Sequence, residues 1–572
     1  MGRRSGIPET SMADKKTSNK KIDAGQKPQR LAAARLFAFG VALVLLLAAF
    51  LRLWGAGWGL PSAMHYFSYH PDENVVLMAA MRVNPLAGVF DPGFYNYGSL
   101  YIYFTSFAIL LGQGWGLIRL PESGGLFSQI GEFSKLFMAG RMVSVLLGVA
   151  TVYVTYALGR RLYGRRAGLA AALIMALLPI HVMHSKFLAV DVTATFFVAL
   201  SLLYAAKISE EGRWADYIAA GIFAGLAAAT KYNAGLVILA PAAAHLVSGR
   251  RVVSARLLLL PVAALVVFLA GTPGIFINPR QFMHDFTYEL MHVRTGHGFV
   301  FEGTGSGFVY HYTHSLLAGM GLPLLILSTA GTVLAAVQRR RGQVALLSFL
   351  VAYYIVIGAA EVRFARYTLL LLPVLAVFAA GFSKWGIESL AKRGRRAGRI
   401  GVALLAIALI YTGAYSSAID CIYARTDTRD SAAAWIESNI PHGSGIMFPT
   451  VPWFYTPPVS PYFGALNPED RYIKSLEVSC YRLIVDKNQE WNTGALKESG
   501  WAVLSSFEYE DRLRIRNQEA LDYFGALEQD YRLVRRCKSV PSIFGIRVPV
   551  GAGLPHDMSY ASPEILIYKR DR

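Results

Sequence analysis

The chain alternates long apolar runs with short basic clusters, and this alternation restricts its fold more than any motif does. A helix needs roughly 20 apolar residues to cross a bilayer, and Lys and Arg collect in the loops that stay in the cytoplasm. The 572 residues are 54% hydrophobic and only 16% charged, which is too apolar for a soluble protein of this length. The sequence therefore predicts an integral membrane protein, and we attribute its net charge of +19 to helix orientation rather than to nucleic-acid binding.

Between successive basic clusters lies room for a helical hairpin that crosses the membrane and returns. The clusters are the N-terminal leader and residues 159–166, 206–213, 248–256, 338–342 and 392–399. We predict about eleven membrane helices, with the N-terminus inside and the C-terminus outside. Their expected ranges are 33–53, 137–158, 167–184, 192–207, 215–230, 233–248, 256–275, 316–336, 344–360, 367–384 and 400–419.

Residues 97–117 are apolar enough to form a further span, but counting them would place the later basic clusters outside. We therefore predict a juxtamembrane helix at the outer surface, where its Tyr and Trp residues suit the interface. The first outer loop then covers about residues 54–136, and a second long outer loop covers about 276–315. Loops of this length are usually functional.

Composition divides the chain into three parts. Residues 1–32 are expected to form a disordered basic cytoplasmic leader, and residues 33–420 an all-α polytopic transmembrane domain that carries the active site. Residues 424–572 mix charges with strand-like runs (GIMFP, RLIVD, WAVLSSF, SIFGIRV) and helix-like runs (428–440, 517–531). This pattern predicts a small soluble α+β domain on the outer side, in which Cys480 and Cys537 could form a disulfide in an oxidising compartment.

Two adjacent acids, Asp72 and Glu73, follow His70 and Pro71 in the first outer loop. One interpretation is structural, because an Asp after a Pro commonly caps a helix such as the one that ENVVLMAAMRV begins. The other is catalytic, because a carboxylate can accept the proton of an attacking hydroxyl group. The two interpretations are compatible.

Other polar residues are expected at the same outer ends of the predicted spans. Each of them alone could be a charge that reaches the interface from a helix end. Together, cations and acids beside lipid suit a phosphorylated lipid, because Arg and Lys bind phosphate oxygens through charge-assisted hydrogen bonds. These residues are Arg141, His181, His184, Lys186, Asp191, Lys231, Tyr232, Arg363 and Arg366.

Several common motifs do not occur in a fitting context, among them the Walker loop, HExxH and GxSxG. The histidines of the second outer loop are spaced too irregularly to predict a metal site. They are His284, His292, His297, His311 and His314. We therefore predict no metal ligands, although a divalent metal is compatible with the chemistry.

The residues YHPDE (69–73), GRMVSVLLGVATVYVTYALGRRLYGRRAG (140–168), GLAAATKYNAGL (225–236) and RFARYTLLLLPVLAV (363–377) resemble bacterial GT-C glycosyltransferases. Within that group the chain most resembles the protein O-mannosyltransferases and aminoarabinose transferases, and the resemblance covers about residues 33–420. DTRDSAAAWIESNIP (427–441) resembles the start of the outer domain of many such proteins. The resemblance implies a GT-C fold with amphipathic helices in the first outer loop. It also implies transfer of a sugar from a polyprenyl-phosphate donor, with inversion at the anomeric carbon.

The resemblance implies that Asp72 is the catalytic acid of the first outer loop and that Glu73 is its supporting neighbour. Arg141, Lys231 and Arg366 match the cations that bind the donor phosphate. Further candidate substrate contacts, matched less directly, are His70, Tyr97, His184, Lys186, Asp191 and Arg363.

The predicted function is therefore inverting sugar transfer at the outer face of a bacterial plasma membrane. The expected partners are a polyprenyl-phosphate sugar, membrane lipids and an envelope glycan, glycolipid or protein acceptor, with no nucleic acid. The absence of a trefoil-type repeat argues against a protein acceptor. The alternative is a secondary transporter or lipid flippase, but the predicted spans carry almost no Asp or Glu and the two halves do not resemble each other.

Overall fold

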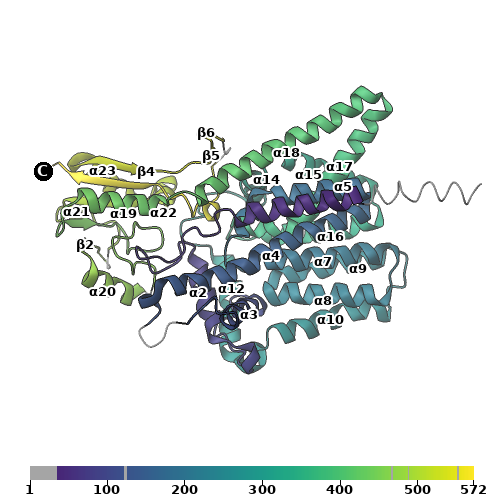
Figure 1. The fold of residues 1–572 in the computed structure, drawn as a ribbon, viewed down its shortest axis with the longest axis horizontal. Helices are drawn as coiled ribbons and strands as arrows, with labels where there is room; N and C mark the ends of the chain where they lie inside the picture. The colour runs from purple at the N-terminus through teal and green to yellow at the C-terminus, as the bar shows by residue number, and fades with distance from the viewer. Residues whose placement is uncertain (1–34, 121–124, 466–467, 487–488, 550–552, 572) are drawn as a thin grey trace, which may run out of the picture.

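A helical bundle carries a smaller strand-containing domain at one end in this computed structural model (Figure 1). The structure describes residues 35–120, 125–465, 468–486, 489–549 and 553–571. The predicted leader, residues 1–32, lies outside the described residues.

Each of the eleven predicted spans falls on one helix or on two consecutive helical segments, and six helices among the described residues are long and apolar enough to cross a membrane by themselves. The bundle comprises the N-terminal helix Arg35–Leu53, α4 (Ile130–Tyr163), α5 (Arg165–Leu177), α6 (Pro179–His184), α7 (Val190–Glu210), α8 (Trp214–Thr230), η3 (Tyr232–Ile238), α9 (Leu239–Val247), α10 (Ala255–Gly271), α14 (Leu317–Met320), α15 (Leu322–Gln338), α16 (Arg341–Gly358), η5 (Ala365–Leu371), α17 (Leu372–Lys392) and α18 (Arg395–Tyr423). The prediction of an all-α polytopic protein is confirmed.

Small residues let neighbouring helices approach closely. Gly221 and Gly225 lie one turn apart on α8 and face α10; a Cβ atom added at Gly221 would lie 2.7 Å from the carbonyl oxygen of Leu260. Such contacts replace the hydrophobic driving force that is missing between helices in lipid. Packing of backbone against backbone therefore fixes the α8–α10 pair.

The two long outer loops form short helices at the end of the bundle that faces the strand-containing domain (Figure 1). The first loop contains α2 (Pro71–Arg82), η1 (Pro85–Ala87), α3 (Leu100–Gly114) and η2 (Leu126–Gln129). The second loop contains α11 (Gly274–Ile277), α12 (Pro279–Thr295), α13 (Gly307–Tyr310) and the π-helical turn η4 (His311–Leu316). The apolar segment predicted as a juxtamembrane helix is α3, which packs on α2 and α4.

The C-terminal domain is built on a five-stranded sheet of order β2-β1-β3-β7-β4. Strands β1, β2 and β3 run parallel, whereas β7 runs antiparallel to both β3 and β4. The elements are α19 (Thr428–Asn439), β1 (Gly445–Met447), α20 (Pro468–Val478), β2 (Arg482–Ile484), α21 (Thr493–Leu496), β3 (Trp501–Ser505), α22 (Ser506–Arg514), α23 (Gln518–Asp530), β4 (Tyr531–Cys537), β5 (Ser542–Ile543), β6 (Ile546–Arg547), η6 (His556–Met558) and β7 (Ile565–Arg570). The predicted α+β character is confirmed, and Cys480 and Cys537 are free thiols in this structure.

A buried ionic cluster attaches this domain to the first outer loop. Arg429, at the start of α19, pairs with Asp427 at 2.8 Å and lies 3.7 Å above the ring of Tyr69. The indole Nε1 of Trp58 donates a hydrogen bond to Asp427 at 2.9 Å, and the Tyr69 hydroxyl donates one to Asp430. The C-terminal domain is therefore fixed to the loop that carries Asp72 and Glu73.

Candidate functional site

The first turn of α2 places the two adjacent acids in very different surroundings. Glu73 is fully buried and receives two hydrogen bonds from Arg141 of α4, at 2.8 and 2.6 Å. The backbone N–H of Leu188 donates a third at 2.7 Å, and the Ser68 hydroxyl donates a fourth. Burial raises the pKa of the Glu73 carboxyl, but the charge and hydrogen bonds of Arg141 outweigh burial and leave that pKa below its ordinary value. Glu73 is therefore an ionised anchor for the loop.

The N–H groups of the Arg141 guanidinium are all hydrogen-bonded within the protein. Its Nη1 donates to the carbonyl oxygens of Ala56 and Trp58 at 2.7 and 2.6 Å, while its remaining N–H groups face Glu73 and Ser68. Its side chain has no exposed surface. The predicted binding of donor phosphate by Arg141 stays a prediction, and this geometry favours a positioning role instead.

Asp72, by contrast, is open to the site. Its side chain is 31% exposed, and its Oδ2 lies 3.4 Å from Nη2 of Arg366. The interpretation of Asp72 as a helix cap is wrong, because His70 holds the N-cap position without a side-chain cap bond and Asp72 lies inside the first turn. A carboxylate at a helix N-terminus is still stabilised there by the helix dipole.

Arg366 links the bundle to the C-terminal domain. It lies in η5, and its guanidinium carbon sits 4.0 Å above the ring of Phe364. Its backbone N–H and that of Ala365 each donate to the Asp557 carboxylate at 2.9 Å, and its Nη1 is 3.5 Å from the Tyr560 hydroxyl. The C-terminal domain thus sets the position of the cation that faces Asp72.

A second ion pair lies at the same ends of the helices. Lys231, which follows α8, pairs with Asp191 of the first turn of α7 at 2.6 Å. The ammonium group also lies 4.7 Å from the ring centre of Tyr367, the residue after Arg366. The structure therefore brings Lys231 and Asp191 together beside η5, and Lys231 is nearly buried.

Two buried histidines line this region without a hydrogen-bond partner. Neither ring nitrogen of His70 or His184 is bonded to any residue that the structure describes. Both rings pack on Phe187, with ring centres 4.4 and 5.6 Å from it, and His70 also contacts Tyr560 at 5.1 Å. Buried imidazole nitrogens without a hydrogen-bond partner are unusual and mark this region as a candidate site.

Tyr97 lies near Asp72. Burial raises the pKa of its phenol, and the negative charge of Asp72 raises that pKa further. Lys186 is placed elsewhere, because it pairs with Asp420 of α18 at 2.9 Å and is buried. Arg363 donates to Thr304 at 2.5 Å and pairs with Glu361 at 3.0 Å. For Lys186 and Arg363 the predicted substrate contacts stay predictions, and these bonds favour structural roles.

Three residues at the site escaped the sequence reasoning: Asp557, Tyr560 and Glu289. Asp557 and Tyr560 lie nearly 200 residues after Arg366 in the sequence, and only the fold brings them close to it. Glu289 of α12 lies near Lys231 and Arg366. Burial raises the pKa of its carboxyl, and these two cations oppose that rise. An acid on an amphipathic helix of the second outer loop was the available signal for Glu289. Within the described ranges, no group of three or more His, Cys, Asp or Glu residues is placed to hold a metal ion.

Comparisons with known proteins agree with this architecture. Residues 125–275 match the family model described as dolichyl-phosphate-mannose-protein mannosyltransferase. The oligosaccharyltransferase AglB of Archaeoglobus fulgidus, solved with an inhibitory peptide and a dolichol-phosphate, is similar in structure, with a TM-score of 0.50 and 13% identity over 94% of this chain and 88% of that one. ArnT from Cupriavidus metallidurans, solved with undecaprenyl phosphate, gives a TM-score of 0.47 and 13% identity over 94% and 98% of the two chains. A search of curated protein sequences finds no match.

Residues 125–275 are therefore similar in sequence to that mannosyltransferase family, over less than half of the chain, and the chain shares its fold with AglB. No finding supports the alternative of a transporter or flippase.

The buried Glu73–Arg141 pair predicts that Glu73 contributes much more than Asp72 to the stability of the fold. Glu73→Gln should lower the free energy of unfolding by about 3 kcal/mol, because it leaves the Arg141 charge buried without its partner. Asp72→Asn, at a partly exposed pair 3.4 Å apart, should change it by less than about 1 kcal/mol. SDS titration in mixed micelles, followed by tryptophan fluorescence, measures both. Equal losses in the two variants would contradict the assignment of Glu73 as the anchor.

Proposed function

We propose that this protein transfers a sugar from a polyprenyl-phosphate donor to a hydroxyl group at the outer face of the membrane, with inversion. The observation that carries the proposal is the partly exposed Asp72 carboxylate beside Arg366, held on a loop that Glu73 and Arg141 fix. A base must be reachable by substrate and rigidly placed, and Asp72 meets both conditions.

In the proposed reaction, Asp72 accepts the proton of the acceptor hydroxyl while that oxygen attacks the anomeric carbon. The bond between the anomeric carbon and the phosphate oxygen breaks, and its electron pair leaves with the lipid phosphate. Attack from the face opposite the leaving group inverts the anomeric centre. The proton then passes from Asp72 to solvent or to the released phosphate.

Arg366 and Lys231 are the cations proposed to receive the departing phosphate. The polar contacts of the Arg366 guanidinium with described residues are long, 3.4 Å to Asp72 and 3.5 Å to Tyr560, so its N–H groups can turn to a phosphate. Lys231 would bind as a compact charge held by Asp191. Cations fixed in place before the reaction stabilise developing charge without reorganisation. The dolichol-phosphate present in the AglB structure, which shares this fold, supports the donor class.

A polar cavity beside the site is the proposed entrance for the acceptor. It measures about 660 Å³ and lies between the second outer loop and the C-terminal domain. Its lining includes Tyr310 and His314 of the loop, and Phe507, Asp511 and His556 of the domain. Aromatic rings with interspersed carboxylates suit the alternating apolar faces and hydroxyl groups of a sugar, so this lining favours a glycan or glycolipid headgroup over a bare peptide.

The turn η6 connects this cavity with the reacting end. His556 lines the cavity, while the adjacent Asp557 accepts the backbone N–H groups of Ala365 and Arg366. Burial, and then the nearby His297 and Arg366, lower the pKa of His556 to about 3, so its imidazole is neutral at physiological pH. An acceptor in the cavity would therefore contact the same turn that positions Arg366.

The proposed location is a bacterial inner membrane, with the C-terminal domain outside. Basic residues cluster at the end of the bundle opposite this domain, at the α4–α5, α9–α10, α15–α16 and α17–α18 turns, as the positive-inside rule requires (Figure 1).

The role of Asp72 predicts that Asp72→Asn lowers the transfer rate at least about 100-fold, because the amide cannot accept the proton. Membranes with the variant would be incubated with labelled polyprenyl-phosphate sugar and a mixed envelope-glycan acceptor, and the labelled product quantified. Glu361→Gln is the matched control, because Glu361 is an exposed acid on the same face that pairs with Arg363. Parental rates in Asp72→Asn at equal expression would refute the proposal.

The acceptor cavity predicts a change in KM that is selective for one substrate. Ser562 lines the cavity, and Ser562→Trp should raise the acceptor KM at least tenfold, because the indole fills space that the acceptor needs. The donor KM should stay within twofold of the parent, since the phosphate is held elsewhere. Ser438→Trp, on the exposed face of α19, is the control. Equal increases in both KM values would contradict this placement.

The proposed orientation predicts which cysteines an impermeant maleimide reaches in intact cells. Cys480 is exposed in the C-terminal domain and should react from outside. A cysteine introduced as Arg396→Cys, at the exposed start of α18, should react only after the membrane is permeabilised. The reverse labelling pattern would place the site in the cytoplasm.

A further inference from the structure

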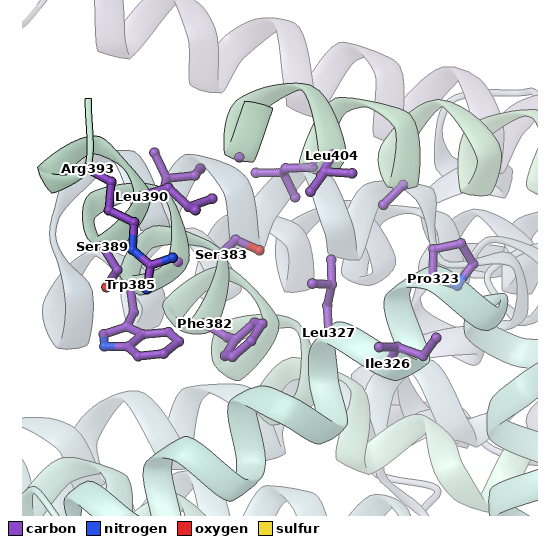
Figure 2. Close-up of a pocket in the computed structure, with 15 residues that line it drawn as sticks. Pro323, Ile326, Leu327, Phe382, Ser383, Trp385, Ser389, Leu390, Arg393 and Leu404 are labelled. Atoms are coloured by element: carbon purple, nitrogen blue, oxygen red, sulfur yellow. The ribbon is translucent and has the colours of Figure 1, made fainter. Parts of the chain in front are cut away.

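An apolar groove runs between α15, α17 and α18, away from the candidate site. It measures about 530 Å³, and Figure 2 shows it extending from Pro323 of α15 past Leu327 and Phe382 to Trp385 and Arg393. Its opposite wall is formed by α18, which diverges from the bundle toward the α17–α18 turn (Figure 1). The groove is therefore long, narrow and open on its side.

The walls of the groove lie in membrane-spanning helices. α17 belongs to the candidate span Ala365–Lys392, and α18 belongs to the candidate span Arg395–Asn439. From Phe382 to Arg393 the helical rise amounts to about 16 Å, roughly half the thickness of a hydrocarbon core. This part of the groove, along the second half of α17, has the length of an acyl chain of a lipid from one leaflet.

One end of the groove is strongly basic. Residues 382–399 contain six basic side chains, Lys384, Lys392, Arg393, Arg395, Arg396 and Arg399, against one acid, Glu388. Arg393 lines the groove, and among the described residues no carboxylate forms an ion pair with it; the nearby Glu388 lies 3.8 Å from Lys384. Trp385, at the same end, is a residue that favours the membrane interface. The groove thus has apolar walls along its length and basic side chains at the end where Arg393 lies.

We propose that this groove binds an anionic phospholipid of the cytoplasmic leaflet, with its phosphate at Arg393 and an acyl chain along α17 and α18. Basic pockets between membrane helices at the cytoplasmic side suit anionic headgroups, and the surrounding Lys and Arg add attraction to the surface. Arg393 lies beyond the far end of α17 from Arg366, and α17 has 21 residues, which separates the two cations by about 30 Å. This lipid site is therefore distinct from the proposed donor site and does not depend on sugar transfer.

Native mass spectrometry of the full-length protein tests this proposal. The detergent-purified protein would be mixed with phosphatidylglycerol or phosphatidylcholine of the same acyl chains, and the retained lipid counted. We expect one phosphatidylglycerol to be retained at least tenfold more than phosphatidylcholine. Arg393→Gln should remove that preference, and Leu404→Trp should remove retention by filling the groove. Arg165→Gln, an exposed cation at the start of α5, is the matched control and should retain the lipid.

Three outcomes would overturn the proposal. One is equal retention of both lipids by the parent, which would mean apolar packing without headgroup recognition. Another is unchanged phosphatidylglycerol retention in both groove variants. The third is displacement of the lipid by equimolar polyprenyl phosphate, which would assign the groove to the donor. Size-exclusion profiles matching the parent establish that each variant is folded, and loss of transfer activity alone has no bearing on the result.

Discussion

The buried pair of Glu73 and Arg141 is the interaction on which the site depends. It joins the first turn of α2 to the middle of α4 and to the backbone of Leu188, with every oxygen of the carboxylate satisfied. An ion pair with no exposed surface is retained only when such bonds offset its desolvation. Because Asp72 is the preceding residue, fixing Glu73 also fixes the direction in which Asp72 points. The two acids thus differ in role: Glu73 holds the loop, and Asp72 is partly exposed beside Arg366.

The second constraint comes from the C-terminal domain. Asp557 accepts two backbone N–H groups at the start of η5, and the Asp427–Arg429 pair lies against Tyr69 of the acidic loop. Arg366 and Asp72 are therefore positioned from opposite sides by the same domain. A domain that supplies such contacts belongs to the candidate site, although the family model matches only residues 125–275 of the bundle.

Much of the fold could be predicted from the sequence, because membrane helices are long and apolar and basic clusters separate them. The helix expected within residues 97–117 is α3, and its placement at the membrane surface stays a prediction. Strands β4 and β7 were missed: YRLVRRC is largely charged, and ILIYKR is short, so neither shows a clear alternating pattern. The ionic residues of the site were found, but sequence could not show how they pair. Arg141 is saturated by Glu73 and Lys186 by Asp420, and such partners 68 and 234 residues away are visible only in three dimensions.

The attachment of the C-terminal domain restricts the route by which the proposed lipid-linked donor reaches Asp72. The cation–π contact of Arg429 with Tyr69 and hydrogen bonds from Trp58 and Tyr69 hold this domain to the acidic loop, and two backbone hydrogen bonds to Asp557 hold it to η5, so it cannot swing aside as a rigid gate. The remaining boundary of the site is α12, whose outer face exposes Met283, Tyr288, Leu290 and Met291 and whose inner face presents Glu289 to the cations. A donor arriving sideways from the bilayer would therefore pass beneath α12, and an amphipathic helix resting on lipid can shift to admit it without breaking the scaffold.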